Sequence, residues 1–419
     1  MLDIQVIREH PERVKNALQR RGESIDLDKI IDFDERRKVV IQERDELRGR
    51  RNSVSKKIGA LKTKPQELIS EMRDIGDRIK TLEAETRNIE DDLSKILLLL
   101  PNIPNAETPD GNDENDNVVI RTSEITRSFD FVPLPHWEIG ENLGIIDFER
   151  GAKISGSRFY ILKGKGAILQ RALISWMLDI HVRENGYEEM YLPDLVNQTT
   201  AAGSGQLPKF ADNMYHDEID DLWLVPTAEV PITGLYSGEI IEPGLLPLRY
   251  VSHTPCFRRE KAAAGRDTRG IKRVHQFEKV EMYKLVEPEN SERELEGMLA
   301  DAETICKKLD IPHQVKLLCT GDLGFAANKT YDIELWAPGC QEWLEVSSCS
   351  NCGDFQSRRA NIRYRQQLGD RPKFLHSLNG SGLGIARVLI AVLENYQQSD
   401  GSVIVPEVLR PYTGFEVIM

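Results

Sequence analysis

The sequence predicts an α+β fold, with a long antiparallel helical hairpin at the N-terminus and a larger domain built on an antiparallel sheet with flanking helices. Three observations lead to this expectation. Apolar residues repeat at heptad spacing within residues 30–96, a polar segment without periodicity follows at residues 101–117, and short β-like runs then alternate with helical stretches. A chain of 419 residues is long enough for two domains with full cores.

The heptad pattern is clearest in residues 68–96, whose seam positions are Leu68, Met72, Ile75, Ile79, Leu82, Thr86, Ile89, Leu93 and Ile96. The same spacing runs through residues 30–61, with arginine at three of its seam positions, Arg37, Arg44 and Arg51. Only Lys62–Pro65 separate the two helices, so they must fold back on each other. At ~1.5 Å per residue, arms of about 32 residues would reach roughly 45–50 Å, and we expect the hairpin, about residues 30–97, to project from the body.

Charge is distributed unevenly over the hairpin. Residues 36–64 contain only Glu43, Asp45 and Glu46 as acids, against Arg36, Arg37, Lys38, Arg44, Arg48, Arg50, Arg51, Lys56, Lys57, Lys62 and Lys64. A solvated coiled coil or a dimerisation rod usually mixes signs on both helices, so this excess favours contact with nucleic acid. Residues 1–100 have a net charge of +1, whereas the remaining residues contribute −14 to the formal total of −13.

The segment PNIPNAETPDGNDENDN at residues 101–117 is typical of an exposed linker. We therefore expect an N-terminal domain of residues 1–100, a linker of residues 101–119 and a second domain of residues 120–419. In the second domain, β-like runs are expected at residues 159–162, 222–226, 249–257, 275–285, 331–336 and 343–347, and helices at residues 166–185, 291–309 and 382–396.

Targeting and redox features are few. The N-terminal stretch MLDIQVIREHPERV lacks the continuous apolar segment of a signal peptide, and the longest apolar run, residues 96–100, is too short to span a bilayer. All six cysteines lie between Cys256 and Cys352 and do not form a disulfide framework for a chain of this size. We expect a cytoplasmic protein with reduced thiols and no membrane association.

The most informative stretch is Cys256–Glu281, CFRREKAAAGRDTRGIKRVHQFEKVE, in which two strand-like ends enclose a loop rich in Arg and Gly. Its cations offer many donors to phosphate oxygens, although a solvated β-hairpin would have the same composition. The alternation at its ends would put Arg258, Glu260 and Phe277 on one face. A cation for phosphate, a carboxylate for an exocyclic amine and a ring for a purine together predict a nucleotide site.

Three shorter motifs supply further polar groups. Thr227-Ala228-Glu229 follows a β-like run, where such residues are more often structural than ligands. Glu345 and Ser347 would share a strand face with Ser348 beside them, which suits Mg²⁺, with a generic edge strand as the alternative. The glycine-rich run from Asn379 to Gly384 leads into a helix, so amides and the Ser381 hydroxyl would converge near Arg387.

Several common motifs are missing or incomplete. No GxxxxGK[ST] string occurs, and the KGKG at residues 163–166 is not a dinucleotide fingerprint because Leu169 stands at the third glycine. Cys349 and Cys352 form one CxxC, but Cys340 and His376, the extra ligands at hand, are irregularly spaced. We therefore favour structural cysteines and expect no zinc.

Taken together, these residues closely resemble the seryl-tRNA synthetases of the common bacterial type. The likeness covers nearly the whole chain: the helical hairpin with its PNIPN linker, GSGQLPKF at Gly203–Phe210, the TAE triplet, the loop from FRRE to HQFEKVE, EVSSCSNC, and NGSGLG with its following Arg. The resemblance implies a class II synthetase domain with three signature motifs, working as a homodimer. These motifs would lie at Gly186–Pro193 in the dimer interface, at Cys256–Glu281 and at Asn379–Arg387.

The resemblance also implies an activity. The enzyme would activate L-serine with ATP to seryl-adenylate and pyrophosphate, then transfer serine to the 3′-terminal adenosine of tRNA(Ser), with tRNA(Sec) as a further candidate acceptor. Arg258 and Arg387 would be catalytic, with Arg258 on the α-phosphate, Glu260 on the adenine amine, and the base between Phe277 and Arg387.

The resemblance assigns the contacts residue by residue. It implies ATP contacts from Arg258, Arg259, Glu260, Val274, Phe277, Glu345, Val346, Ser347, Ser348 and Arg387, and Mg²⁺ ligands at Glu345 and Ser348. The implied serine contacts are Thr227, Ala228, Glu229, Arg258, Glu281, Asn379 and Ser381. Expected tRNA contacts are Arg36, Arg37, Arg44, Arg48, Arg51, Lys56, Lys57, Arg266 and Arg269.

The chemistry of the residues agrees with this resemblance. Attack of a carboxylate on an α-phosphate brings two anions together, so catalysis requires positioning and neutralisation rather than a protein nucleophile. The ammonium and hydroxyl of serine need acceptors, which Glu229 and Glu281 supply; which glutamate holds which end is left open. An enzyme that loads a carrier protein would need no basic hairpin, and a non-catalytic coiled-coil adaptor would leave the nucleotide residues without a role.

Overall fold

The computed structural model describes residues 1–60, 65–124, 127–261 and 269–419, which divide into two units. One unit contains residues 2–19 and 23–101, and the other contains residues 102–419 with residues 1 and 20–22. Among the described residues, no helix is both long and apolar enough to cross a membrane.

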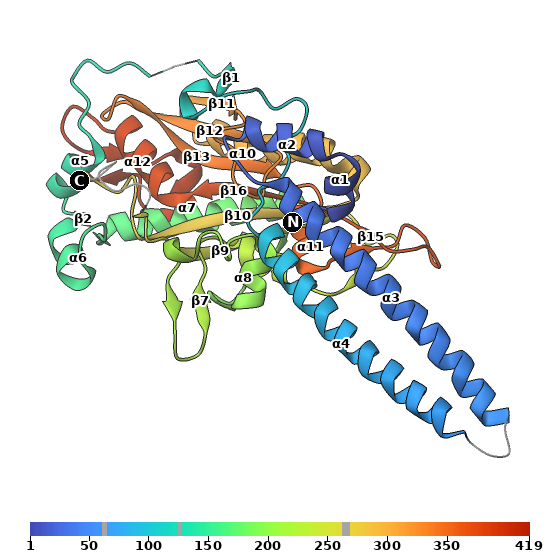
Figure 1. The fold of residues 1–419 in the computed structure, drawn as a ribbon. Helices are drawn as coiled ribbons and strands as arrows, with labels where there is room; N and C mark the ends of the chain where they lie inside the picture. The colour runs from blue at the N-terminus through green and yellow to red at the C-terminus, as the bar shows by residue number, and fades with distance from the viewer. Residues whose placement is uncertain (61–64, 125–126, 262–268) are drawn as a thin grey trace. The chain divides into compact units, whose positions relative to one another are not determined.

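The first unit is helical and contains α1 (Ile4–Glu9), α2 (Pro11–Arg20), α3 (Leu27–Ala60) and α4 (Gln66–Leu97). α3 and α4 form the predicted antiparallel hairpin (Figure 1). The α4 seam is buried at Ile75, Ile79, Leu82, Thr86, Ile89 and Leu93, and the Thr86 hydroxyl is satisfied by the carbonyl of Leu82 at 2.8 Å. The polar interruption in the seam therefore leaves no unpaired hydroxyl.

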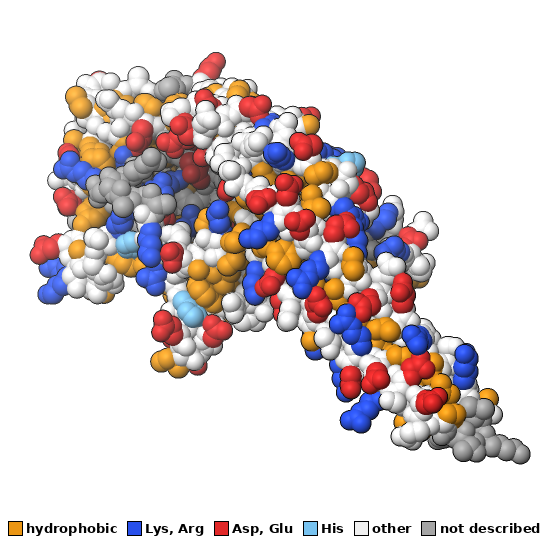
Figure 2. Space-filling model, viewed as in Figure 1, with side chains coloured by type: hydrophobic (Ala, Val, Ile, Leu, Met, Phe, Trp, Pro, Cys, Tyr) orange, Lys and Arg blue, Asp and Glu red, His pale blue; other side chains and the backbone are white. Residues whose placement is uncertain are grey.

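Ion pairs link the two helices at heptad intervals. Arg36 pairs with Glu85 at 2.7 Å, Glu43 with Arg78 at 2.7 Å and Arg50 with Glu71 at 2.5 Å, so each step of seven residues along α3 is matched by seven back along α4. This ladder fixes the antiparallel register, as charges flanking a coiled-coil seam do. It also corrects the expectation of a one-sided charge, because acids of α4 face the cations of α3. Figure 2 shows both signs interspersed along this hairpin.

The second unit is built on an eight-stranded sheet in the order β1-β11-β12-β13-β16-β10-β9-β4. Its strands are β1 (Val118–Thr122), β4 (Glu188–Glu189), β9 (Leu248–Phe257), β10 (Gln276–Val286), β11 (His313–Leu317), β12 (Lys329–Ala337), β13 (Glu342–Asn351) and β16 (His376–Gly384). Every neighbouring pair is antiparallel except β4 with β9. The predicted antiparallel sheet is confirmed.

Helices cover one face of this sheet (Figure 1). α7 (Lys165–Arg183) contacts both α10 (Ser291–Lys308) and α12 (Ile385–Asn395), and all three pack on the strands. Along β10, Val280 and Met282 enter this core, so the alternating residues Phe277, Lys279 and Glu281 face the other side. The helix layer thus leaves the part of the opposite face that carries these three residues for a site, whereas Tyr283 and Leu285 further along β10 pack in a second hydrophobic cluster.

Smaller elements complete the unit. The helices are α5 (His136–Asn142), α6 (Phe148–Ser155), α8 (Gln198–Ser204), α9 (Glu229–Gly234), α11 (Phe355–Ala360) and α13 (Arg410–Thr413). The short strands are β2 (Ile146–Asp147), β3 (Ile161–Leu162), β5 (Leu195–Asn197), β6 (His216–Asp217), β7 (Leu222–Leu224), β8 (Ile240–Ile241), β14 (Arg363–Tyr364), β15 (Lys373–Phe374), β17 (Val403–Ile404) and β18 (Val417–Ile418).

Two local expectations differ from the structure. The run Asn379–Gly384 does lead into a helix, α12, but that helix begins only at Ile385 rather than at residue 382, and the run itself is the end of strand β16, paired with β10 and β13. The segment after Pro101 is not exposed throughout: Asn102 is buried and donates from Nδ2 to the carbonyls of Ala326 and Cys352, both at 2.8 Å. In both cases long-range hydrogen bonds order a segment whose composition is typical of a loop.

Candidate active site

A cavity of about 390 Å³ lies on the face of the sheet opposite the helix layer. Strands β10, β13 and β16 form its floor, and the segments that follow β9 and precede β10 form its rim. Its wall includes thirteen of the residues expected from the sequence: Thr227, Glu229, Arg258, Glu260, Val274, Phe277, Glu281, Glu345, Val346, Ser348, Asn379, Ser381 and Arg387. Motifs spread over 160 residues therefore converge on one site.

Strand register explains this convergence. Glu281 of β10 lies opposite Ser381 of β16, and Phe277 lies opposite Cys256 near the end of β9. Arg258 and Glu260 follow that end, outside the strand, and Glu260 takes a left-handed conformation with φ 49°. The expected alternation of Arg258 and Glu260 along a strand is thus wrong in detail, although both reach the cavity.

One end of the cavity is acidic. Glu229 Oε1 accepts hydrogen bonds from Gln356 Nε2 at 2.5 Å and Asn379 Nδ2 at 3.0 Å. Glu281 is almost fully buried, pairs with Lys279, and accepts from the Thr227 hydroxyl at 3.2 Å. Burial, reinforced by the nearby charge of Glu281, raises the pKa of Glu229 to about 7. This end can therefore receive a cation, whose charge would favour the ionised form of Glu229.

The other end is rich in cations. The Arg258 guanidinium lies over the Phe277 ring, 5.1 Å from its centroid, and its Nε donates to the carbonyl of Pro226 at 3.2 Å. Arg387 Nη1 donates to the carbonyl of Glu345 at 2.7 Å and meets its carboxylate at 3.1 Å. Arg273 pairs with Glu260 at 3.1 Å. This arrangement can neutralise a polyphosphate next to an aromatic face.

Acidic oxygens meet where β12 and β13 pair. Asp332 lies opposite Ser348, and its Oδ1 is buried without a hydrogen-bond partner among the described residues. Burial and the charge of Glu345 raise the pKa of Asp332 well above its usual value. Burial alone would also raise the pKa of Glu345, but Arg387, Arg258 and Arg273 together hold it below its ordinary value. A carboxylate, a hydroxyl and an orphaned carboxyl oxygen fit a hard divalent cation.

Three of the expected contacts are not on the cavity wall. Arg259 donates from Nε to the carbonyl of Met214 at 2.9 Å and stacks on Tyr215. Ser347 is buried, with its hydroxyl donating to the carbonyl of Ser381 at 2.6 Å, and Ala228 is buried in a hydrophobic cluster. The residues directly before and after each of these three line the cavity. Arg259, Ser347 and Ala228 therefore support the wall from behind.

The wall also contains residues that sequence reasoning did not single out as ligands. Lys279 shares the two-residue period of Phe277 and Glu281, so its position could have been predicted. Lys272 and Arg273 of the Cys256–Glu281 loop also line the wall, as does Gln206 of the GSGQLPKF motif. Gln356, which holds Glu229, lies on α11 and carries no local signal.

The expected tRNA contacts on the hairpin fall into two groups. Arg36 and Arg48 pair with glutamates of α4, at 2.7 and 2.8 Å, and Arg37 and Arg44 pair with Asp34 and Asp45 of their own helix, at 2.7 and 2.8 Å. Within the described ranges, Arg51, Lys56 and Lys57 form no ion pair and are the cations most available to a polyanion. Arg269, near the cavity, is exposed, with its guanidinium 5.2 Å from the Trp137 ring centroid, and Arg266 lies outside the described residues.

All six cysteines are free thiols. Cys349 and Cys352 are both buried, and burial raises the pKa of each thiol. Cys352 accepts a hydrogen bond from Asn379 Nδ2 at 3.4 Å and so stands behind the acidic end of the cavity. These contacts fit the expected structural role of this pair.

Comparison with known proteins identifies the family. Residues 1–104 match the model of the seryl-tRNA synthetase N-terminal domain, and residues 210–396 match that of the tRNA synthetase class II core domain (G, H, P, S and T). The serine–tRNA ligase of Roseiflexus sp. (strain RS-1) is 58% identical over 422 residues, covering 100% of this chain and 99% of its own. That of Thermomicrobium roseum is 56% identical over 416 residues, covering 99% and 94%.

Comparison with solved structures indicates the same family. The seryl-tRNA synthetase from Pyrococcus horikoshii, complexed with ATP, superimposes with a TM-score of 0.93 at 40% identity and covers 100% of this chain and 99% of its own. The cytoplasmic serine–tRNA ligase from Naegleria fowleri, in complex with AMP, gives a TM-score of 0.88 at 32% identity, covering 100% and 98%. The chain belongs to the seryl-tRNA synthetase family.

Proposed function

We propose that the chain is a serine–tRNA ligase that forms seryl-adenylate in the cavity on β10, β13 and β16 and then transfers serine to the 3′-terminal adenosine of tRNA(Ser). One observation carries this proposal: a single cavity holds two carboxylates at one end and a set of guanidinium and ammonium groups around an aromatic ring at the other. This polarity matches an amino acid placed end to end with ATP.

The acidic end is assigned to serine. Glu229 and Glu281 supply acceptors for its ammonium and hydroxyl, and Thr227, Asn379 and Ser381 complete the polar wall. Glu281 already forms an ion pair with Lys279. Burial disfavours the negative charge of Glu229, so a bound cation would stabilise that carboxylate, and we assign the ammonium of serine to Glu229. A site built to bond a hydroxyl discriminates strongly against alanine, which would leave those groups unpaired.

The basic end is assigned to ATP. Adenine would stack on Phe277, with Glu260 on its exocyclic amine and Arg387 on the opposite face, and Arg258 would leave the ring for the α-phosphate. An oxygen of the serine carboxylate attacks the α-phosphorus, the bond to the bridging oxygen breaks, and pyrophosphate departs with that electron pair. Arg258 and Arg387 neutralise the charge that accumulates, and no protein nucleophile takes part.

Magnesium fits the oxygens next to Arg387. Glu345 and Ser348 would hold the ion, with Asp332 behind them. When bound, Mg²⁺ supplies charge neutralisation and orientation of the phosphates. To bind the ion, the Glu345 carboxylate would give up its ion pair with Arg387. The Arg387 guanidinium would then be available to the nucleotide.

The remaining parts are assigned to the tRNA and to dimer formation. Residues 1–100 would bind the tRNA backbone through the hairpin, residues 101–119 would form the connection, and residues 120–419 would catalyse both steps. Recognition through phosphates predicts strong salt dependence. Residues 186–193, with Tyr191 fully exposed, would form the homodimer interface. Six unpaired thiols fit a cytoplasmic enzyme.

The activity is tested by ATP–pyrophosphate exchange with each amino acid in turn, for which serine should give the only strong signal. Strong exchange with another amino acid would overturn the pocket assignment. Charging of tRNA(Ser) and tRNA(Sec), assayed separately, defines the acceptors. Absence of ATP binding would instead favour a non-catalytic adaptor, and serine transfer to a carrier protein would favour a carrier-loading enzyme.

A further inference from the structure

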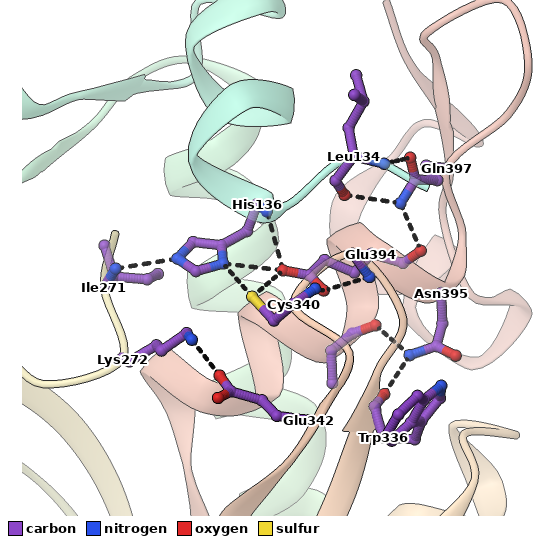
Figure 3. Close-up of polar contacts among 12 residues, drawn as sticks. Leu134, His136, Ile271, Lys272, Trp336, Cys340, Glu342, Glu394, Asn395 and Gln397 are labelled. Carbon is purple, nitrogen blue, oxygen red and sulfur yellow. Dashed lines mark hydrogen bonds and ion pairs between the residues drawn. The ribbon is translucent and has the colours of Figure 1, made fainter. Parts of the chain in front are cut away.

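A buried polar cluster lies outside the cavity, and none of its three members lines the cavity wall. It joins His136 at the start of α5, Cys340 in the turn between β12 and β13, and Glu394 near the end of α12 (Figure 3). His136 Nδ1 and Cys340 Sγ lie 2.9 and 3.0 Å from Glu394 Oε1, and the three ligand atoms fall within 4.8 Å of one another. His136 and Glu394 have no exposed surface.

The hydrogen bonds of this cluster favour a polar network over a metal site. The amide of Ile271 donates to His136 Nε2 at 3.0 Å, so Nε2 is the acceptor nitrogen and the proton of the neutral ring is on Nδ1. A metal on Nδ1 would require the ring proton to move to Nε2. The Nε2–H group would then face the N–H group of Ile271, so two donors would meet with no acceptor between them. Glu394 is also fully satisfied, since the amides of His136, Gly339 and Cys340 each donate to it at 2.9 Å.

The cluster connects to the cavity through two successive peptide units. Ile271, whose amide His136 accepts, precedes Lys272, whose carbonyl accepts from Arg387 Nε at 3.2 Å. Arg387 and Glu394 are seven residues apart and lie on the same face of α12. α12 therefore contacts the Ile271–Lys272 segment in two ways. Arg387 binds the Lys272 carbonyl directly, and Glu394 binds His136, which in turn accepts from the Ile271 amide.

The local geometry is close-fitting. Gly270 has φ +73°, and a Cβ there would approach the Trp137 ring to 2.9 Å and His136 Nε2 more closely still. Lys272 also pairs with Glu342, which follows the Cys340 turn. Burial lowers the pKa of His136, which keeps the imidazole neutral and Nε2 an acceptor at neutral pH.

We propose that His136 is a positioning residue for the nucleotide end of the cavity: held by Glu394, it fixes the Ile271 amide and so aligns the Lys272 carbonyl and Lys272 side chain with Arg387. This inference rests on the proposed assignment of that end to ATP. It predicts an effect on ATP that is separate from serine, because Glu229 and Glu281 belong to other elements.

Two substitutions distinguish the contact of Nδ1 with Glu394 from the contact of Nε2 with the Ile271 amide. In His136→Asn the amide nitrogen can replace Nδ1 and donate to Glu394, but nothing accepts from Ile271. In His136→Gln the longer side chain can place its oxygen where Nε2 was. We expect His136→Asn to raise the KM for ATP in serine-dependent exchange by about fivefold or more, with the KM for serine within about twofold of wild type, and His136→Gln to restore most of the loss.

His313→Asn is the matched control, since His313 is also buried but lies on β11 beside Glu303 and does not line the cavity. It should lower Tm without changing either KM. Hydrogen exchange of the peptide containing Ile271 should accelerate in His136→Asn and not in His313→Asn. This readout remains available if a variant loses activity.

Failure of the inference differs from failure of the proposed function. Wild-type protein without serine-dependent exchange would overturn the function. Wild-type exchange with an unchanged KM for ATP in His136→Asn, or an equal rise in both KM values, would overturn the positioning role. A thiolate charge-transfer band on adding Co²⁺ to wild type, lost in Cys340→Ser, would establish a metal site instead.

Discussion

The ionisation of Glu229 should control serine binding in the neutral pH range. Burial and the charge of Glu281 raise the pKa of Glu229 to about 7, and only the ionised carboxylate can balance the ammonium of serine. The ionised fraction would rise from about one tenth at pH 6 to about nine tenths at pH 8, while free serine keeps its ammonium. The KM for serine should therefore fall about tenfold from pH 6 to pH 8.

The measurement is serine-dependent pyrophosphate exchange at saturating ATP, in buffers of constant ionic strength. Glu229→Gln should raise the KM for serine and abolish its pH dependence. Glu281→Gln should move the midpoint to lower pH, because it removes the second cause of the shift. A KM for serine that is flat from pH 6 to pH 8, or a slope that persists in Glu229→Gln, would refute the reasoning.

Further predictions concern the other parts of the molecule. Deletion of residues 30–97 should leave pyrophosphate exchange largely intact and abolish charging of tRNA; normal charging would contradict the division of labour. Replacing Arg51, Lys56 and Lys57 with Ala should raise the KM for tRNA and reduce its salt dependence, whereas Arg36→Ala, which removes a cation already paired with Glu85, should have a smaller effect. Phe277→Ala should raise the KM for ATP about tenfold through lost stacking, measured by exchange, with the KM for serine as internal control. Chelation of Mg²⁺ should abolish exchange, and Glu345→Gln should raise the Mg²⁺ concentration needed to restore it; an unchanged requirement would place the metal elsewhere.

Local patterns predicted the long helices and four strands of the central sheet, β9, β10, β12 and β13, but not β11 or β16. The heptad spacing identified α3 and α4, and the alternation around Cys256–Glu281 located β9 and β10 to within one residue of their observed ends, Phe257 and Gln276. Such patterns work because a helix or strand repeats its exposed and buried faces at a period set by its own backbone. The glycine-rich run at Asn379 failed this test, because its strand hydrogen bonds come from β10 and β13.

The candidate site was predicted mainly through family resemblance, and local reasoning reached only part of it. Spacing alone grouped Arg258, Glu260 and Phe277, although Arg258 and Glu260 reach the cavity from beyond the end of β9 and not by alternation along it. Gln356, which holds Glu229 from 127 residues away, could not, because nothing near it in the sequence marks a ligand. The same holds for the pairing of α3 cations with α4 acids, which depends on the register between two helices.

The sequence by itself determined the helical hairpin, the strands β9, β10, β12 and β13, the cations of the Cys256–Glu281 loop and the family, because each depends on residues that are neighbours or on motifs in order. Only the tertiary structure decided which of these side chains share a cavity, which cations are already paired, and how His136 reaches Glu394, 258 residues away, to hold the Ile271 amide. Those contacts arise from strand register and helix packing, in which a small shift of one element exchanges the partners of every side chain on it.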